Sequence, residues 1–169
     1  QQMVEPAGAY YQQMVKAVEA KQLESADRLN ERIIQEHGAT IYSTFAQLAQ
    51  AKLKVDAGDL ASARRLLEAV LASSAEDKFK HLARLRLGQV LLDGNAAMAA
   101  LGLVEQQAKD KGFGAFERDY ELLKGDIYSA LGRQDEARTA YQAAQHLGAA
   151  SAILEMKLDE LGRSEGPLR

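Results

Sequence analysis

The chain has 169 residues, with 21 lysines and arginines, 24 aspartates and glutamates, and no cysteine. Acidic and basic residues are spread through both halves, which argues against a nucleic-acid-binding protein because such proteins normally show a basic face. The 47% of hydrophobic residues can bury a continuous core, and no linker or low-complexity segment interrupts them. We therefore expect a single domain over residues 1–169.

A period of 37 residues runs along this chain. Alanine recurs at one position of the period in all four repeats. The residue five places before each alanine forms a second position of the period. The alanines are Ala26, Ala63, Ala100 and Ala137, and the preceding residues are Lys21, Gly58, Asn95 and Gly132. This spacing is typical of a helical solenoid, and solenoids mostly bind other proteins.

In chain order, the register predicts helix hairpins at about residues 7–38, 41–74, 78–111 and 115–148. The last of these is the clearest, and it resembles the small and large positions of a tetratricopeptide (TPR) unit. We expect Gly125 and Ala137 where its two helices cross closely, and Gly132 at the turn that ends the first helix. Tyr128 and Tyr141 would fill the wedge toward the neighbouring hairpin.

Residues 151–161 follow the last hairpin and carry apolar side chains at helical spacing. These are Ile153, Leu154, Leu158 and Leu161. We interpret the segment as a capping helix, because the last hairpin would otherwise leave an apolar face in water. No proline occurs between Pro6 and Pro167. The expected fold is therefore all-α, a TPR-like right-handed helical solenoid of about four hairpins and a C-terminal capping helix.

Catalytic and metal-binding groups do not gather in the sequence. The histidines His37, His81 and His146 lie far apart, with no carboxylate at a metal-ligand spacing. We expect no catalytic residue, no metal and no cofactor.

The first helix of each hairpin lines the concave surface in this architecture, and two rows of residues fall there. The first row is Tyr11, Leu48, Leu85 and Leu122, and the second is Val18, Val55, Leu92 and Ser129. An apolar row at fixed spacing is explained either by packing between hairpins or by a groove for an extended or helical peptide segment. The residues predicted to bind a partner are Tyr11, Phe45, Leu48, Lys52, Val55, Leu82, Leu85, Gln89, Leu92, Leu122 and Asp126.

A narrower resemblance comes from longer runs of sequence. They are Leu48-Ala49-Gln50-Ala51, Leu60-Ala61-Ser62-Ala63, Ala83-Arg84-Leu85-Arg86-Leu87-Gly88, Gly125-Asp126-Ile127-Tyr128, Ala137-Arg138-Thr139-Ala140-Tyr141 and Glu155-Met156-Lys157-Leu158-Asp159. In this order, over roughly residues 8 to 162, the string resembles the YfgM family.

The resemblance implies an inner-membrane protein of Gram-negative bacteria with one N-terminal transmembrane helix and a periplasmic TPR-like domain. Members of the family are ancillary subunits of the SecYEG translocon. They associate with the chaperone PpiD and are thought to help exported proteins after translocation. The chain has no apolar run near 20 residues. We therefore expect the anchor upstream of a fragment that was cut after it.

The expected function is that of a non-enzymatic periplasmic adaptor that engages a partner protein, and possible clients are exported polypeptides. The alternative is a structural scaffold or a homo-oligomerising TPR adaptor in an envelope assembly or a stress-signalling pathway.

Overall fold

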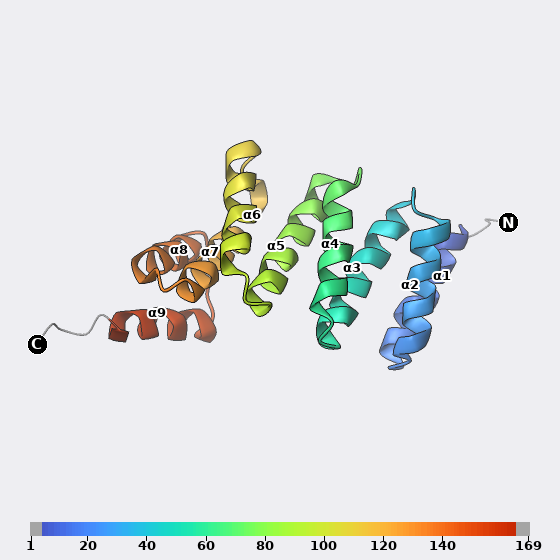
Figure 1. The fold of residues 1–169 in the computed structure, drawn as a ribbon, viewed down its shortest axis with the longest axis horizontal. Coiled ribbons are helices and arrows are strands. Elements are labelled where there is room, and N and C mark those ends of the chain that lie inside the picture. Colours follow the sequence, from blue (N-terminus) through green and yellow to red (C-terminus); the bar gives the residue numbers. More distant parts are fainter. Residues whose placement is uncertain (1–4, 165–169) are drawn as a thin grey trace, which may run out of the picture. The chain divides into compact units, whose positions relative to one another are not determined.

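The structure is a computed structural model that describes residues 5–164. Within that range the regular elements are α-helices and one short 3₁₀ helix (Figure 1). They are α1 (Pro6–Glu19), α2 (Leu23–Glu36), α3 (Ile41–Asp56), α4 (Leu60–Ala72), α5 (Asp77–Asp93), α6 (Ala97–Asp110), η1 (Gly114–Phe116), α7 (Glu117–Ala130), α8 (Gln134–His146) and α9 (Ala152–Ser164). The all-α class predicted from the sequence is confirmed.

The chain divides into two compact units, and the boundary between Val90 and Leu91 lies inside α5. Unit 1 contains the hairpins α1/α2 and α3/α4, and α3 also packs against α1 and α2. Unit 2 contains α6, the hairpin α7/α8 and the helix α9, which packs on α8. The single domain expected from the sequence stays a prediction.

The turn inside each hairpin explains the second position of the 37-residue period. All four residues have a positive φ, namely 58° at Lys21, 80° at Gly58, 63° at Asn95 and 74° at Gly132. The next residue donates its backbone N–H to the carbonyl five residues before it, in the bonds Gln22 to Ala17, Asp59 to Lys54, Ala96 to Leu91 and Arg133 to Tyr128, each 2.8 Å long. This is the Schellman helix end, so each first helix stops at the same place in its repeat.

The crossing of α7 and α8 depends on a residue without a side chain. A Cβ added to Gly125 would lie 2.2 Å from the ring of Tyr141, so only glycine fits against this ring without a shift. Tyr141 is 1% exposed. The missing side chain at Gly125 thus leaves room for the aromatic ring of Tyr141 on the opposite helix.

The helix α9 covers the hairpin α7/α8 with one face. Leu154 and Leu161 are buried and form a cluster with Ala137 and Tyr141. Ile153 shares the apolar spacing of the predicted capping helix but is 65% exposed, because it lies roughly a quarter turn around α9 from Leu154 and Leu161. The capping helix is therefore confirmed, whereas Ile153 does not belong to its packed face.

A buried polar contact joins α2 to α3 in unit 1. The Asn30 amide nitrogen donates to Gln50 Oε1 over 2.8 Å, and Gln50 Nε2 donates to Asp27 Oδ1 over 2.7 Å. Lys54 Nζ also lies 3.4 Å from Asp27 Oδ2. Asn30 is fully buried, and among residues 5–164 its Oδ1 has no hydrogen-bond partner.

Candidate partner-binding groove

Unit 1 holds an apolar groove between α1, α3 and the first residue of α2. Its volume is about 450 Å³. We call it the α1–α3 groove, and its lining residues are Tyr11, Met14, Val15, Val18, Glu19, Leu23, Ala49, Lys52, Leu53, Asp56 and Ala57. Most of these side chains are hydrophobic, which is the usual character of a binding cleft.

Helix periodicity places different residues of α1 at the floor and at the open side of the groove. Met14 is 2% exposed and packs with Ala17 and Ala26, so it belongs to the floor. Val15 and Val18 are each 36% exposed and lie beside this cluster on α1. Leu23, the first residue of α2, is 51% exposed. The groove therefore presents apolar surface to solvent.

Three charged side chains accompany this apolar surface. Glu19 comes from α1, whereas Lys52 and Asp56 come from α3. Lys52 and Asp56 are four residues apart on one helix, yet within residues 5–164 neither they nor Glu19 form an ion pair. Their charges are therefore available to a molecule that enters the groove.

An aromatic cluster adjoins the groove at Tyr11. The ring of Tyr11 lies 5.9 Å from that of Tyr42 and 5.6 Å from that of Phe45. Phe45 in turn meets Phe79 of α5 edge to face, with 5.4 Å between the ring centres. These contacts pack Tyr11 against α3 and give this end of the groove an aromatic wall.

The residues of unit 1 that the sequence analysis selected fall into different environments. Tyr11 and Lys52 line the groove, as does Val18 of the second row. Leu48 is buried, which fits the alternative of packing between hairpins. The other predicted residues of this unit that are half-buried are Phe45, Val55, Leu82 and Leu85. Gln89 is exposed.

In unit 2 the residues predicted to bind a partner take part in contacts within the unit or are half-buried. Leu122 packs against the cluster formed by α8 and α9. Asp126 accepts hydrogen bonds from the Tyr141 hydroxyl and, over 2.7 Å, from Lys157 Nζ of α9. Leu92 is half-buried in α5. Partner binding by the full set of selected residues stays a prediction.

Val15 and Leu23 line the groove but were not selected from the sequence. Val15 stands one repeat before Lys52 in the 37-residue register, so the register itself could have found it. Leu23 begins the second helix of its hairpin and stands one repeat before Leu60. Ala97 and Gln134 continue that row, so its apolar signal is weak.

Titratable groups with altered pKa values lie in structural positions. Burial, together with the hydrogen bond to Asp126, raises the pKa of Tyr141 well above its ordinary range. Burial and the nearby Arg84 lower the pKa of His81. Among residues 5–164 there is no group of three histidines and carboxylates that could hold a metal ion.

A second cavity of unit 1 has a different chemical character. It is about 240 Å³ in volume and lies beside the loops that precede α3 and α5. Small and hydroxyl-bearing residues, among them Gly38, Thr40, Ser43, Ser73 and Ser74, make up much of its lining. It offers less apolar surface than the α1–α3 groove, which is therefore the stronger candidate for binding a protein segment.

In the part of the chain that the structure describes, no helix combines the length and the apolar character needed to cross a bilayer.

Comparison with known proteins places these features in context. The tetratricopeptide repeat-like domain family matches residues 1–163. A protein of Haemophilus influenzae named "Ancillary SecYEG translocon subunit" is 28% identical over 163 residues, which are 95% of this chain and 77% of that protein. A protein of Aggregatibacter actinomycetemcomitans with the same name is also 28% identical, over 165 residues that cover 95% and 77% of the two chains. The predicted resemblance to this group of proteins is confirmed.

The solved structures add support for the fold. The crystal structure of a tetratricopeptide repeat protein from Parabacteroides merdae superposes with a TM-score of 0.68 and covers 94% of this chain and 58% of that chain. Its sequence identity is 14%, so the likeness concerns the fold alone. The TPR-like architecture predicted from the 37-residue period is confirmed.

Proposed function

Because this chain belongs to the tetratricopeptide repeat-like domain family, which matches residues 1–163, we propose that it is a non-enzymatic interaction module that works at the SecYEG translocon. The α1–α3 groove of unit 1 is its partner-binding site. The names of the relatives motivate the choice of the translocon, since they describe those proteins as ancillary translocon subunits.

The observation that carries the proposal is the open apolar surface of the groove. Val15, Val18 and Leu23 remain exposed although they adjoin the buried cluster around Met14. Exposed apolar surface that gathers in one concave place is typical of a binding site for another protein. Among the groups whose pKa is altered, Tyr141 and His81 have surroundings that are structural rather than catalytic.

The finer parts of the proposal follow the family resemblance. The module would lie on the periplasmic side of the bacterial inner membrane and would act together with the chaperone PpiD. Its clients would be exported polypeptides that have just left the translocon.

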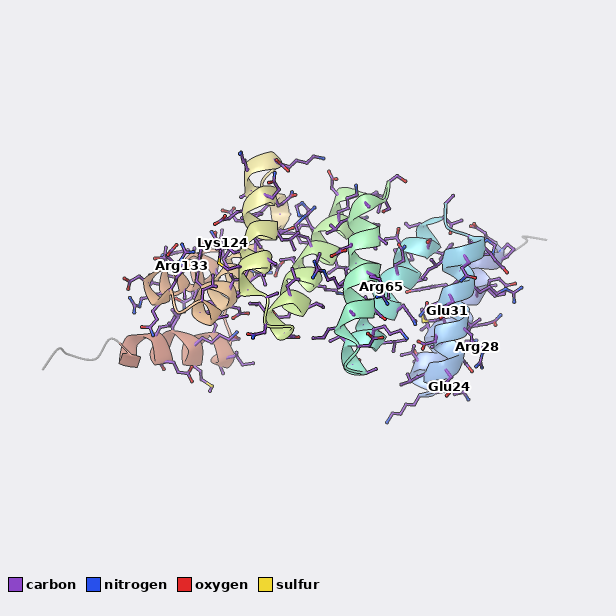
Figure 2. All side chains as sticks on the ribbon, viewed as in Figure 1. Glu24, Arg28, Glu31, Arg65, Lys124 and Arg133 are labelled. Atoms are coloured by element: carbon purple, nitrogen blue, oxygen red, sulfur yellow. The ribbon has the colours of Figure 1, made fainter. Side chains whose placement is uncertain are left out.

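Site-specific photo-crosslinking in intact cells tests the proposal. A photoreactive residue at Val18 is expected to form adducts with translocon subunits, PpiD or exported polypeptides, identified by mass spectrometry. The matched control carries the same residue at Glu31, which lies on α2 of the same unit, outside the groove lining (Figure 2). Equal adducts at both positions, or adducts at Glu31 alone, would contradict the assignment of the groove.

A second candidate function is a homo-oligomerising scaffold in an envelope assembly or a stress-signalling pathway. It is favoured by α9, on which Ile153 and Met156 are 65% and 61% exposed. Light scattering over a range of concentrations distinguishes the two. A mass that rises with concentration in the natural chain, but not in Ile153→Asp/Met156→Asp, would support the scaffold.

A further inference from the structure

The charges of the α1–α3 groove come mainly from carboxylates. Glu19 and Asp56 lie on α1 and α3, the two helices that form its walls, and Lys52 is the single cation in the lining. None of the three has an ion-pair partner within residues 5–164. By contrast, Asp27 of the same unit is satisfied by Gln50 and Lys54. The carboxylates of the groove are thus left unpaired beside a hydrophobic floor.

In unit 2 a carboxylate also lies beside an apolar surface, and there the helix α9 covers both. The helix α9 inserts Leu154 and Leu161 into an apolar cluster and places Lys157 Nζ 2.7 Å from Asp126 Oδ1. Apolar side chains beside a lysine therefore match an apolar surface beside a carboxylate. The same chemistry, supplied by another polypeptide, complements the α1–α3 groove.

The exposed face of α9 does not have that chemistry, so this face of a second copy is a poor occupant. Ile153 and Met156 lie among Glu155, Asp159 and Glu160, which are all exposed. Carboxylates on both sides of the contact would repel each other, and like-charge juxtaposition disfavours a partner. The charges favour a partner that carries cations.

We propose that the α1–α3 groove selects a polypeptide segment in which a short apolar run is flanked by lysine or arginine. The apolar side chains lie against Val15, Val18 and Leu23, and the flanking cation lies beside Glu19 and Asp56. This inference rests on the proposed function of the groove and adds the chemical class of its partner. Charge here decides which segment binds, whereas the apolar contact supplies most of the affinity.

Three labelled peptides with the same central run of leucine, alanine and valine provide the test. Their flanks carry lysine, serine or glutamate, and binding to the full chain is measured by fluorescence polarisation. At low salt the lysine-flanked peptide is expected to bind about tenfold more tightly than the glutamate-flanked one, since two exposed ion pairs can supply such a factor. The difference should shrink at high salt because exposed charges are screened.

Matched variants locate the selectivity. In Glu19→Gln/Asp56→Asn the preference for lysine is expected to fall to within about twofold, because the attracting carboxylates are gone. Glu24→Gln/Glu31→Gln removes the same charge from α2 outside the groove lining (Figure 2) and should keep the full preference. A circular dichroism melt of each variant establishes that it is folded.

Two results would overturn the inference. If all three peptides bind equally well, or if none binds, the groove does not select a cationic apolar segment. If both double variants lose the preference equally, the effect comes from overall charge rather than from Glu19 and Asp56. The crosslinking at Val18 judges the proposed function separately, since it does not depend on the charge of the partner.

Discussion

The hairpin α1/α2 of unit 1 and the hairpin α7/α8 of unit 2 stand at the same place in the 37-residue register, but they fill their interiors differently. Where unit 1 has Met14 and Asn30, unit 2 has Gly125 and Tyr141, three repeats later. All four residues are buried. A large residue in the first helix thus goes with a small one in the second, and the reverse holds in unit 2. The two hairpins therefore exchange which helix carries the larger side chain at these positions.

The two hairpins also differ in the hydrogen bonds formed by the polar groups of the buried Asn30 and Tyr141. The Tyr141 hydroxyl reaches Asp126, which Lys157 of α9 also contacts. The Asn30 amide donates to Gln50, while its Oδ1 has no partner in the part of the chain that the structure describes. Unit 2 therefore meets its polar requirement with its own covering helix, whereas unit 1 keeps an open groove and an unsatisfied oxygen.

The largest expected effect comes from Gly125→Ala. The new Cβ would lie 2.2 Å from the Tyr141 ring, and overpacking of this kind should lower the free energy of unfolding by about 3 kcal/mol. Urea denaturation measures the change. Gly102→Ala on α6 is the control. Apart from its chain neighbours and the backbone of its own helix, no atom of the described residues lies within 4 Å of a Cβ added there, so alanine should raise stability by about 0.5 to 1 kcal/mol.

A second variant shows whether the clash is the cause. In a Tyr141→Leu background the Gly125→Ala substitution should lose most of its effect, since the ring that it strikes is absent. An equal loss of stability in both backgrounds would contradict the exchange of volumes between the two helices.

Gln50→Leu tests the polar side of the comparison in unit 1. It leaves the buried Asn30 amide with no partner, which should lower the free energy of unfolding by about 2 kcal/mol. Asn30→Leu/Gln50→Leu removes the polar groups at both ends of the bond and should recover most of that loss. Thermal melts of the three chains decide the matter, and a double variant no more stable than Gln50→Leu would refute this account.

Alkaline pH should weaken unit 2 through Tyr141. Burial and Asp126 raise its pKa above the ordinary value of 10.0. The unfolded chain therefore releases the proton first, and stability is lost as the pH rises above 10. One such group changes the free energy of unfolding by at most about 1.4 kcal/mol per pH unit. The slope above pH 10 in denaturation experiments should be shallower in Tyr141→Phe, and an unchanged slope would speak against this role.

The turns allow a smaller comparison between the units. Lys21 adopts a φ of 58° in a turn for which other repeats use glycine. Lys21→Gly should therefore raise the free energy of unfolding by about 1 kcal/mol. Asn95→Gly in unit 2 should gain about 0.5 kcal/mol, because asparagine tolerates this conformation better than lysine does. Thermal melts that rank the two variants in the reverse order would contradict the explanation.

The smallest expected effect is an acid sensitivity of unit 1. Burial and Arg84 lower the pKa of His81 below its ordinary value of 6.5. As the pH falls below 6.5 the unfolded chain takes up the proton first, so stability present at higher pH is lost. Melts between about pH 8 and about pH 5 should show a smaller decline in His81→Gln than in the natural chain. Identical declines would remove His81 from the account.

Much of the fold could be predicted because the signals are local. The four turn positions at Lys21, Gly58, Asn95 and Gly132 end their helices through bonds between residues five apart. Helix periodicity and glycine positions are likewise properties of short stretches of chain. The candidate site was harder to predict, since Leu48 and Val18 belong to the same kind of apolar row, yet one is buried and the other lines the groove.

The sequence by itself determined the helical class, the period, the place of each turn and the presence of a covering helix at the C-terminal end. Only the tertiary structure decided which apolar side chains stay in contact with solvent. It covered Leu122 and engaged Asp126 through α9, and it left Val15, Val18 and Leu23 open in unit 1. The physical reason is that exposure depends on what packs against a residue from elsewhere in the chain, whereas core and groove both require apolar residues at the same helical spacing.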